Sequence, residues 1–268
     1  MALTVAGRSE PRVLVVGATQ GMGRASALKL AEGGARVALI ARTAGDLGVL
    51  EKDVSAAGAT DVATFTADVT DADAVTAAVA GAAERWSGLD GVVNTVGLCE
   101  PVRAGFLEID DGYYQRAFDS VFLSAVRTCR AALPHLLVGG GAIVNVSAMS
   151  IRHYIPMLAH YSSQKIALAH LTKNLAREFG ARGIRTNAVM PGMIESDGVA
   201  ARKAAAMAEN NWTEDEYFAF TNAKYHFVTY ANRLGQPAEI GDAVTWLISD
   251  QSSYVNGAWL PVDGGSVF

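Results

Sequence analysis

The amino-acid sequence predicts an α/β fold in which a doubly wound, Rossmann-like parallel sheet forms a single domain over residues 1–268. Two patterns lead to this prediction. Short apolar runs alternate with amphipathic stretches, which is typical of parallel strands covered by helices on both faces. A glycine-rich segment also lies between the first apolar run and the first amphipathic stretch. A chain of 268 residues, half of them apolar, is long enough to bury one such core.

The alternation assigns each element in order. We expect strands at residues 12–16, 37–41, 62–66, 89–94, 142–147, 185–190 and 258–262. Between them we expect helices at residues 24–33, 44–57, 72–86 and 161–180, and one long helix or two over residues 108–137.

The segment from about residue 196 to residue 233 contains no predicted strand. It is rich in alanine and then in aromatic residues, namely Trp212, Tyr217, Phe218, Phe220, Tyr225, Phe227 and Tyr230. Because ligands bind at the carboxyl ends of the strands in such sheets, we expect this segment to form a helical substrate lid over that crevice. Its aromatic side chains either face the crevice or pack the lid onto the body or onto another subunit.

Composition argues against several classes of protein. The formal charge of −5 and the lack of a basic cluster argue against a nucleic-acid-binding surface. No apolar run reaches the roughly 18 residues of a membrane-spanning helix, and the N-terminus lacks a signal-type apolar core. The two cysteines, Cys99 and Cys129, lack metal-ligand spacing, so we expect buried thiols in a reducing cytoplasm and no metal site.

The glycine-rich segment predicts a dinucleotide site. Gly17, Gly21 and Gly23 permit a tight turn that brings backbone close to a pyrophosphate, and Thr19, Gln20 and Met22 complete the loop. The helix that begins here presents free N–H groups and the positive end of its dipole to a phosphate.

The end of the second strand favours NADP(H) over NAD(H), although NAD(H) stays open. An acidic side chain at this place would bind the ribose 2′-hydroxyl of NAD, but Ala41 holds it and Arg42 follows. A guanidinium here can pair with a 2′-phosphate. Asp68 ends the third strand, where it can accept a hydrogen bond from the adenine amino group. Asn94 and Gly97 end the fourth strand and are expected close to the adenosine portion.

Tyr161 and Lys165 stand four residues apart in a predicted helix, so their side chains share one face. A neighbouring ammonium favours the phenolate and lowers a tyrosine pKa from about 10. A tyrosine tuned in this way can exchange a proton at a carbonyl or alcohol. The alternative is an ordinary surface contact between two helical side chains.

Together these motifs resemble the short-chain dehydrogenase/reductase family over residues 13–265. The loop matches the family's GxxxGxG motif, and Asp68-Val69 matches its adenine-binding pair. Residues 94–97 match its Asn-Asn-Ala-Gly motif with two substitutions, and Tyr161 with Lys165 matches its YxxxK pair. Further matches are the Pro-Gly turn with Pro191, Gly192 and Ile194, Ser196 in place of a threonine, and C-terminal signatures at residues 233–237 and 262–265.

The resemblance implies an oxidoreductase that acts on a small molecule. It also implies a homotetramer, or else a dimer, assembled through the long helices and the C-terminal strand. Tyr161 would protonate the carbonyl oxygen as hydride arrives, or take the proton in reverse. Lys165 would lower the tyrosine pKa and hold the nicotinamide ribose, and the backbone of Ile194 would bind the carboxamide. From the aromatic lid we expect a small or medium apolar substrate bearing a carbonyl or secondary alcohol.

Two positions depart from the family pattern. The family places a serine thirteen residues before the tyrosine, where this chain has Ala148. Ser147 is adjacent but is expected on the opposite face of the strand, whereas Ser150 shares the face of residue 148 better. The family's asparagine in the helix after the fourth strand is replaced by Val121.

These departures leave three functions open. The chain is an oxidoreductase in which Ser147, Ser150 or a substrate hydroxyl replaces the lost donor, or a non-redox cyclase, dehydratase or isomerase, or a nucleotide-binding regulator. Retention of Tyr161 and Lys165 argues against the regulator. Four further residues are candidates for pocket lining or for ordinary packing: Cys99, His153, His160 and His226.

Overall fold

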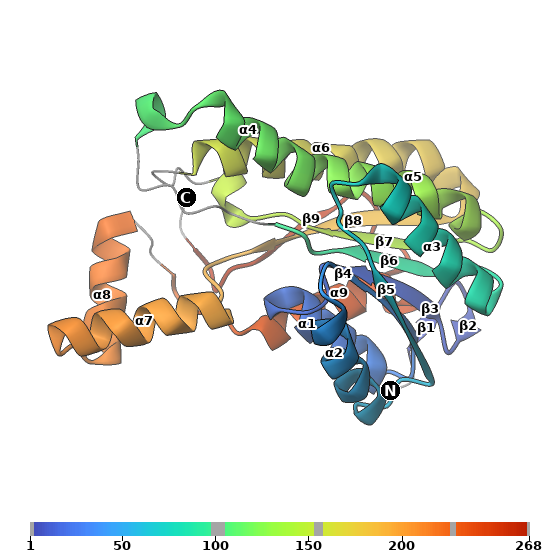
Figure 1. Ribbon diagram of the computed structural model, residues 1–268, viewed down its shortest axis with the longest axis horizontal. Helices are drawn as coiled ribbons and strands as arrows, with labels where there is room; N and C mark the ends of the chain where they lie inside the picture. Colours follow the sequence, from blue (N-terminus) through green and yellow to red (C-terminus); the bar gives the residue numbers. More distant parts are fainter. Residues whose placement is uncertain (1–2, 98–104, 153–157, 226–228, 267–268) are drawn as a thin grey trace.

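The computed structural model describes residues 3–97, 105–152, 158–225 and 229–266 of the chain. Its centre is a seven-stranded sheet in the order β5-β4-β3-β6-β7-β8-β9, in which all neighbouring strands are parallel (Figure 1). These strands are β3 Arg12–Val16, β4 Arg36–Ala41, β5 Asp61–Thr66, β6 Gly91–Asn94, β7 Gly141–Val146, β8 Ile184–Pro191 and β9 Trp259–Val262. All seven predicted strands are present, and the predicted doubly wound α/β fold is confirmed.

Helices cover both faces of the sheet (Figure 1). One core cluster joins the sheet to α1 Gly21–Glu32, α2 Ala44–Ala56 and α9 Pro237–Ile248, and the other joins it to α3 Ala72–Trp86, α5 Ser124–Leu136 and α6 Ala159–Phe179. The strands between these layers are almost fully buried, as continuous apolar runs require. Short 3-10 turns connect these elements at η1 Phe106–Glu108, η3 Met149–Ile151, η4 Gly180–Arg182 and η5 Asp250–Ser252.

The order of the strands fixes where a ligand crevice lies. The chain runs from β3 outward through β4 to β5 and then returns to β6 on the other side of β3. The helices that follow β3 and β6 therefore pack on opposite faces, and in sheets of this topology ligands bind at the carboxyl ends of these two strands. The glycine-rich loop lies at this point of the sheet.

The helical stretch predicted over residues 108–137 is a single run with a widened centre. The Ser124 N–H donates to the carbonyl of Asp119, five residues earlier, which is the π-helical pattern. Val121 is fully buried in this widened part. The three segments are α4 Asp111–Ala117, the π-helical η2 Phe118–Leu123 and α5.

The region after β8 contains two helices, α7 Asp197–Asn210 and α8 Glu214–Tyr225. Both extend sideways from the body of the molecule (Figure 1). No residue of α7 is fully buried, and its half-buried residues, among them Val199, Lys203 and Met207, recur at helical spacing along one side. Within the described part of residues 196–233 the structure has no strand, as predicted, and closure of the two helices over the carboxyl ends of the strands stays a prediction.

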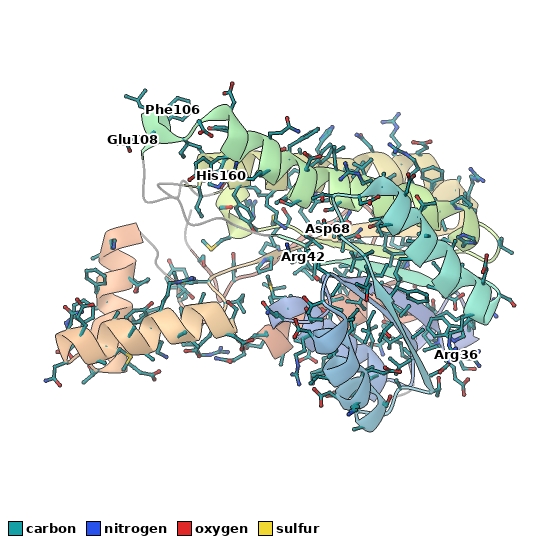
Figure 2. All side chains as sticks on the ribbon, viewed as in Figure 1. Arg36, Arg42, Asp68, Phe106, Glu108 and His160 are labelled. Atoms are coloured by element: carbon teal, nitrogen blue, oxygen red, sulfur yellow. The ribbon has the colours of Figure 1, made fainter. Side chains whose placement is uncertain are left out.

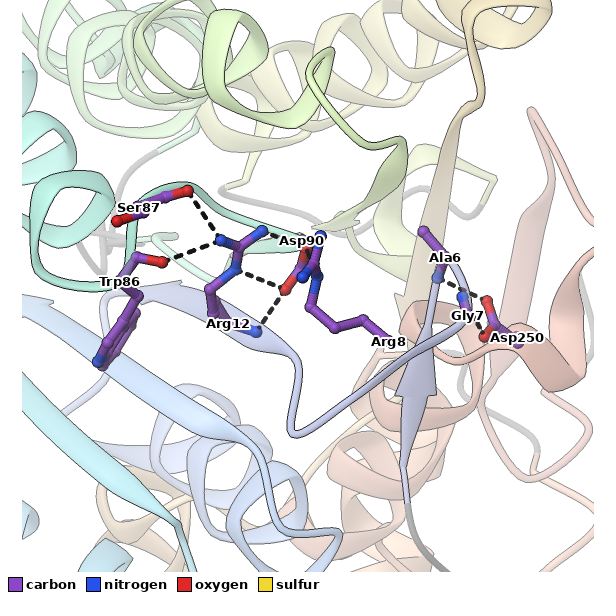
Figure 3. A network of polar contacts seen from close by, with 8 residues as sticks. All are labelled: Ala6, Gly7, Arg8, Arg12, Trp86, Ser87, Asp90 and Asp250. Carbon is purple, nitrogen blue, oxygen red and sulfur yellow. Dashed lines mark hydrogen bonds and ion pairs between the residues drawn. The ribbon is translucent and has the colours of Figure 1, made fainter.

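An N-terminal hairpin, β1 Thr4–Val5 and β2 Arg8–Ser9, was not predicted. Its turn is held by Asp250, whose carboxylate accepts from the N–H groups of Ala6 at 2.7 Å and Gly7 at 2.9 Å (Figure 3). The hairpin therefore connects the start of the chain to the end of α9.

A buried carboxylate ties this hairpin to the sheet (Figure 3). Asp90 accepts from the Arg12 guanidinium at 2.8 and 2.7 Å and from Arg8 Nε at 3.0 Å, and Arg12 also donates to the carbonyls of Trp86 and Ser87. Burial alone would raise the pKa of Asp90, but the hydrogen bonds and charge of Arg12, with the charge of Arg8, hold it below its usual value.

Of the helices in the described ranges, none has the length and apolar character needed to span a bilayer. Cys129 is a free, buried thiol in α5, and burial raises its pKa to about 12. Cys99 lies outside the described residues.

Candidate active site

The loop between β3 and α1 is folded too tightly to admit a side chain at Gly17 or Gly23. Gly17 and Gly21 have φ of +81° and +50°, in the left-handed region. A Cβ at Gly23 would lie 2.1 Å from the Gly17 carbonyl oxygen, and one at Gly17 would lie 2.9 Å from Thr95 Oγ1. The sequence motif therefore reflects two close approaches, one to the backbone of the loop itself and one to the Thr95 side chain.

The start of α1 fits a pyrophosphate. Its N-cap, Gln20, makes no side-chain hydrogen bond to the first turn, and that turn carries no acidic residue. Its N–H groups and positive dipole end thus meet no competing side-chain anion of this helix. Thr19 and Met22 are half-buried, and the Ser196 Cβ lies 3.7 Å from where a Cβ at Gly21 would be. The segment after β8 therefore begins beside the glycine loop.

Thr95 is a site residue that sequence reasoning missed. Its Oγ1 donates to the carbonyls of Val16 at 2.7 Å and Gly17 at 3.2 Å, so it fixes the loop from the end of β6. The signal was one of the two substitutions in the Asn-Asn-Ala-Gly motif. Asn94 is buried and donates to Asn145 Oδ1 at 2.8 Å, so its side chain ties β6 to β7.

The ends of β4 and β5 bring Arg42 and Asp68 together (Figure 2). The Ala67 N–H donates to the Ala41 carbonyl at 2.9 Å, so the residues that follow are neighbours. Hydrogen bonds from the Thr70 N–H and hydroxyl lower the pKa of Asp68, and the charge of Arg42 lowers it further. Arg42 is exposed and Ala41 is buried, so the end of β4 presents a cation to solvent, with Asp68 from the end of β5 as the neighbouring acid. Val69, the neighbour of Asp68 in sequence, packs into the core.

Tyr161 and Lys165 lie on α6 with Lys165 Nζ 5.5 Å from the Tyr161 ring centroid. Lys165 is only 1% exposed, and its Nζ donates to the carbonyls of Val146 at 2.7 Å and Val96 at 3.3 Å. A Cβ at Gly97 would lie 2.8 Å from Lys165 Nζ and 3.5 Å from Tyr161 Oη. The pair thus meets the ends of β6 and β7, and a surface contact between them is excluded by the burial of the lysine.

The two serines near residue 148 have different surroundings. Ser147 is 1% exposed, and its Oγ donates to the Lys165 carbonyl at 2.9 Å. Ser150 is 8% exposed, and its Oγ has no hydrogen-bond partner among the described residues. Ala148 has extended backbone between them, and Val121 is fully buried in η2.

The Pro-Gly turn after β8 packs against the C-terminal segment. The Gly192 N–H donates to the Val262 carbonyl at 3.0 Å, and a Cβ at Gly192 would lie 2.7 Å from Asp263 Cα. Ile194 is buried and forms an isolated parallel bridge with Gly235. Pro191, the last residue of β8, is buried as well.

A pocket lies behind this turn, between α8 and the C-terminal segment, with Met193, Phe218, Asn222 and Arg233 among its lining residues. Arg233 is ion-paired to Glu239 at 2.6 Å. Trp212 and Phe220 pack against each other with ring centroids 4.7 Å apart. Of the predicted lid aromatics, Trp212 therefore packs the link between α7 and α8 onto α8, whereas Phe218 lines a pocket.

A protein-family model described as enoyl-(acyl carrier protein) reductase matches residues 17–266 of this chain. The chain belongs to the short-chain dehydrogenase/reductase family. The 2-(R)-hydroxypropyl-CoM dehydrogenase of Xanthobacter autotrophicus is 34% identical over 256 residues, which cover 94% of this chain and 96% of that protein. The cis-4-hydroxycyclohexanecarboxylate dehydrogenase of Sinomonas cyclohexanicum is 36% identical over 261 residues, which cover 96% of each.

Solved structures agree with this assignment. The crystal structure of levodione reductase has a TM-score of 0.84 at 29% identity and covers 94% of this chain and 96% of that chain. A 3-oxoacyl-[acyl-carrier protein] reductase from Brucella melitensis has a TM-score of 0.83 at 31% identity, with coverages of 96% and 91%. This short-chain dehydrogenase/reductase is therefore an NAD(P)(H)-dependent oxidoreductase, which is the activity common to its relatives.

The histidines add less to this short-chain dehydrogenase/reductase site. His160 is buried between the rings of Tyr113 and Tyr114, at centroid distances of 5.9 and 6.4 Å, and so connects α6 to α4 (Figure 2). His153 and His226 lie outside the described residues. Within the described ranges, no group of three or more His, Cys, Asp or Glu side chains is arranged to hold a metal ion.

Proposed function

We propose that this chain transfers hydride between NADP(H) and the carbonyl or secondary alcohol of a small or medium apolar substrate. The observation that carries the proposal is the approach of Tyr161 and Lys165 to Gly97, at the strand ends beside the uncapped start of α1. The proposed proton donor and the glycine loop proposed to bind the dinucleotide therefore lie at the same edge of the sheet. Relatives whose names describe alcohol dehydrogenation and ketone reduction support the same chemistry.

The residues of this chain would handle the proton and the orientation. A bound nicotinamide would supply or accept the hydride, which is the chemistry that the protein itself lacks. Gly17, Gly21 and Gly23 would cradle the pyrophosphate, and the backbone of Ile194 would hold the carboxamide. Tyr161 Oη would give its proton to the substrate oxygen during reduction and take it back during oxidation. Lys165 would stabilise the phenolate, because a nearby ammonium favours that form.

The test of the reaction is hydride transfer to a ketone. NADPH consumption is measured with levodione and cyclohexanone, and Tyr161→Phe is expected to lower kcat by roughly 10²–10⁴-fold because it removes the general acid. Tyr254→Phe, at a fully exposed tyrosine on the opposite edge, should leave kcat unchanged. NADPH binding by the wild type without turnover of either ketone or of the corresponding alcohols would argue against the oxidoreductase.

The preference for NADP(H) rests on Arg42. Arg42→Ala is expected to weaken NADPH binding roughly 10- to 100-fold, from ~1.5–3 kcal/mol for hydrogen bonds to a charged group, and to change NADH binding far less. Arg36→Ala is the matched control, since Arg36 begins the same strand at the opposite edge and pairs with Glu10 at 3.0 Å (Figure 2). Equal losses for NADPH and NADH in Arg42→Ala would reject the 2′-phosphate role.

A non-redox cyclase, dehydratase or isomerase is the second candidate, and Ala148 and Val121 favour it because they remove two polar groups that the family pattern expects. A nucleotide-binding regulator comes third. Turnover of a ketone with NADPH by the wild type would distinguish the oxidoreductase from the non-redox enzyme and from the regulator.

We also propose a cytoplasmic homo-oligomer, a tetramer or a dimer, with helical lid 196–233 closing over substrate. Half-exposed apolar side chains on the long helices, such as Phe122, Leu123 and Ile166, support assembly through these helices. Light scattering of the purified protein measures the state, and a monomer at micromolar concentration would contradict it.

A further inference from the structure

The hydroxyl groups of Ser147 and Ser150 lie on either side of Ala148 in the sequence, and they differ in their hydrogen bonding. Both belong to the segment that leaves the carboxyl end of β7 and leads toward α6, the helix of Tyr161 and Lys165. This segment includes η3, which packs against α6. The surroundings of each hydroxyl therefore bear on the proton chemistry proposed for Tyr161.

The Ser147 hydroxyl already has a structural partner. Its Oγ donates to the Lys165 carbonyl at 2.9 Å, and its N–H donates to the Val189 carbonyl at 2.8 Å. Ser147 thus connects β8, the end of β7 and the turn of α6 that carries Lys165. With its one proton committed to that carbonyl, the hydroxyl is a poor donor to a substrate.

The Ser150 hydroxyl is buried and unsatisfied. Ser150 is 8% exposed, and among the described residues its Oγ has no hydrogen-bond partner. A buried hydroxyl without a partner costs free energy, so such groups in native proteins point to a missing ligand or water. The other two unpartnered buried hydroxyls of the described chain, Thr186 and Thr245, lie inside β8 and α9 instead of at the carboxyl edge.

We propose that Ser147 and Ser150 divide between them the work around the reacting oxygen. Ser150 Oγ donates a hydrogen bond to the substrate oxygen, and Ser147 is a positioning residue that fixes the Lys165 turn. During reduction a bound reduced nicotinamide would supply the hydride to the carbonyl carbon, and Tyr161 would give its proton to the oxygen and become the phenolate that Lys165 stabilises. Ser150 would keep its own proton. This inference rests on the proposed oxidoreductase function and names the second donor of that site.

The first test removes the Ser150 hydroxyl. Ser150→Ala is expected to lower kcat with levodione and NADPH by roughly 10²–10³-fold, the usual loss for one preorganised donor, with NADPH affinity unchanged. Ser163→Ala is the matched control, because Ser163 is an exposed serine of α6 whose Oγ donates within that helix. Adding Ala148→Ser to Ser150→Ala should restore part of the rate by supplying a hydroxyl two residues away.

The second test concerns Ser147. Ser147→Ala is expected to lower kcat by roughly 10- to 100-fold through displacement of Lys165, while KM for levodione changes less than about 2-fold. Ser147→Thr retains the hydroxyl and should recover the rate. Thermal unfolding of each variant separates a loss of rate from a loss of fold.

The outcomes distinguish the two proposals. If the wild type turns over ketone and Ser150→Ala keeps more than half of its kcat, the role of Ser150 is overturned and the oxidoreductase stands. If Ser147→Ala keeps wild-type kcat, or Ser147→Thr fails to recover a loss, the positioning role is overturned. If the wild type and Ala148→Ser both fail with levodione and with its alcohol, the proposed function fails and this inference fails with it.

Discussion

The two edges of the sheet satisfy their polar groups in opposite ways. At the amino edge, both carboxylate oxygens of Asp90 are bonded to Arg12, and Arg8 adds a further contact (Figure 3). At the carboxyl edge, the first turn of α1 has no side-chain cap, and the buried Ser150 hydroxyl has no partner among the described residues.

This difference separates stability from function. Bonds made within the chain at the amino edge lower the free energy of the fold and leave nothing for a ligand. Polar groups without a hydrogen-bond partner at the carboxyl edge cost stability until a ligand bonds them. The carboxyl edge is also where doubly wound sheets bind their ligands. Mutations at the two edges should therefore fail in different assays.

The largest expected effect on stability is at the amino edge. Arg12→Ala should lower the free energy of unfolding by about 3–5 kcal/mol, because it leaves the buried Asp90 carboxylate poorly compensated. We expect a value toward the lower end, because Arg8 still faces Asp90. Urea unfolding measures the loss, and kcat per folded molecule should be unchanged.

Arg8→Ala is the matched control for this change. The Arg8 side chain is 49% exposed, so its pair with Asp90 is screened by solvent and should contribute below about 1 kcal/mol. Equal losses for the two arginines would mean that the buried pair does not dominate this edge.

An intermediate effect is expected in the glycine loop at the carboxyl edge. Gly23→Ala places a methyl group 2.1 Å from the Gly17 carbonyl oxygen, so the loop must move. We expect a loss of about 1–3 kcal/mol from overpacking, together with loss of NADPH binding measured by fluorescence titration. Gly48→Ala in α2 meets nothing within 4 Å and should instead stabilise by about 0.5–1 kcal/mol. Retained NADPH affinity in Gly23→Ala would show that the close approach is dispensable.

The smallest effect is expected at Glu239, near the start of α9. Its hydrogen bonds to Arg233 and to the Gln236 N–H lower its pKa from 4.5 to about 2. Because the folded-state pKa is lowered, its contribution is complete above the unfolded pKa and is lost as pH falls toward 2. Glu239→Gln should therefore cost less than about 1 kcal/mol at neutral pH and clearly less near pH 2, as measured by urea unfolding at both values. A cost that is the same at both pH values would contradict the ion pair as its cause.

Long and strongly patterned elements were predictable. β3 and α3 have the predicted bounds, and the other predicted strands and helices differ by at most a few residues at their ends. Their apolar periodicity reports burial directly. The hairpin β1–β2 was missed because its two-residue strands are stabilised by Asp90 and Asp250, which lie far away in sequence. α9 was not assigned, although Pro237 and Glu239 are start signals that the sequence displays.

The candidate site was predictable in its residues but not in their hydrogen bonds. The spacing of Tyr161 and Lys165 placed them on one helix face, whereas the burial of Lys165 depends on the carbonyls of Val96 and Val146. The alternation of side chains along an extended segment favoured Ser150 over Ser147 as the substitute for residue 148, but it could not show which hydroxyl already has a partner. Their different surroundings depend on how α6 packs against the end of β7.

The sequence by itself determined the seven strands of the central sheet, most of the helices between them, the glycine loop and the family, because periodicity and short motifs are properties of neighbouring residues. Only the tertiary structure decided that Thr95 fixes the loop and that Arg12 and Arg8 surround Asp90. It also decided that the Ser147 hydroxyl has a hydrogen-bond partner, whereas the Ser150 hydroxyl has none among the described residues. These features join segments that are distant in the chain, and a hydrogen bond depends on distances of a few ångströms that no local pattern encodes.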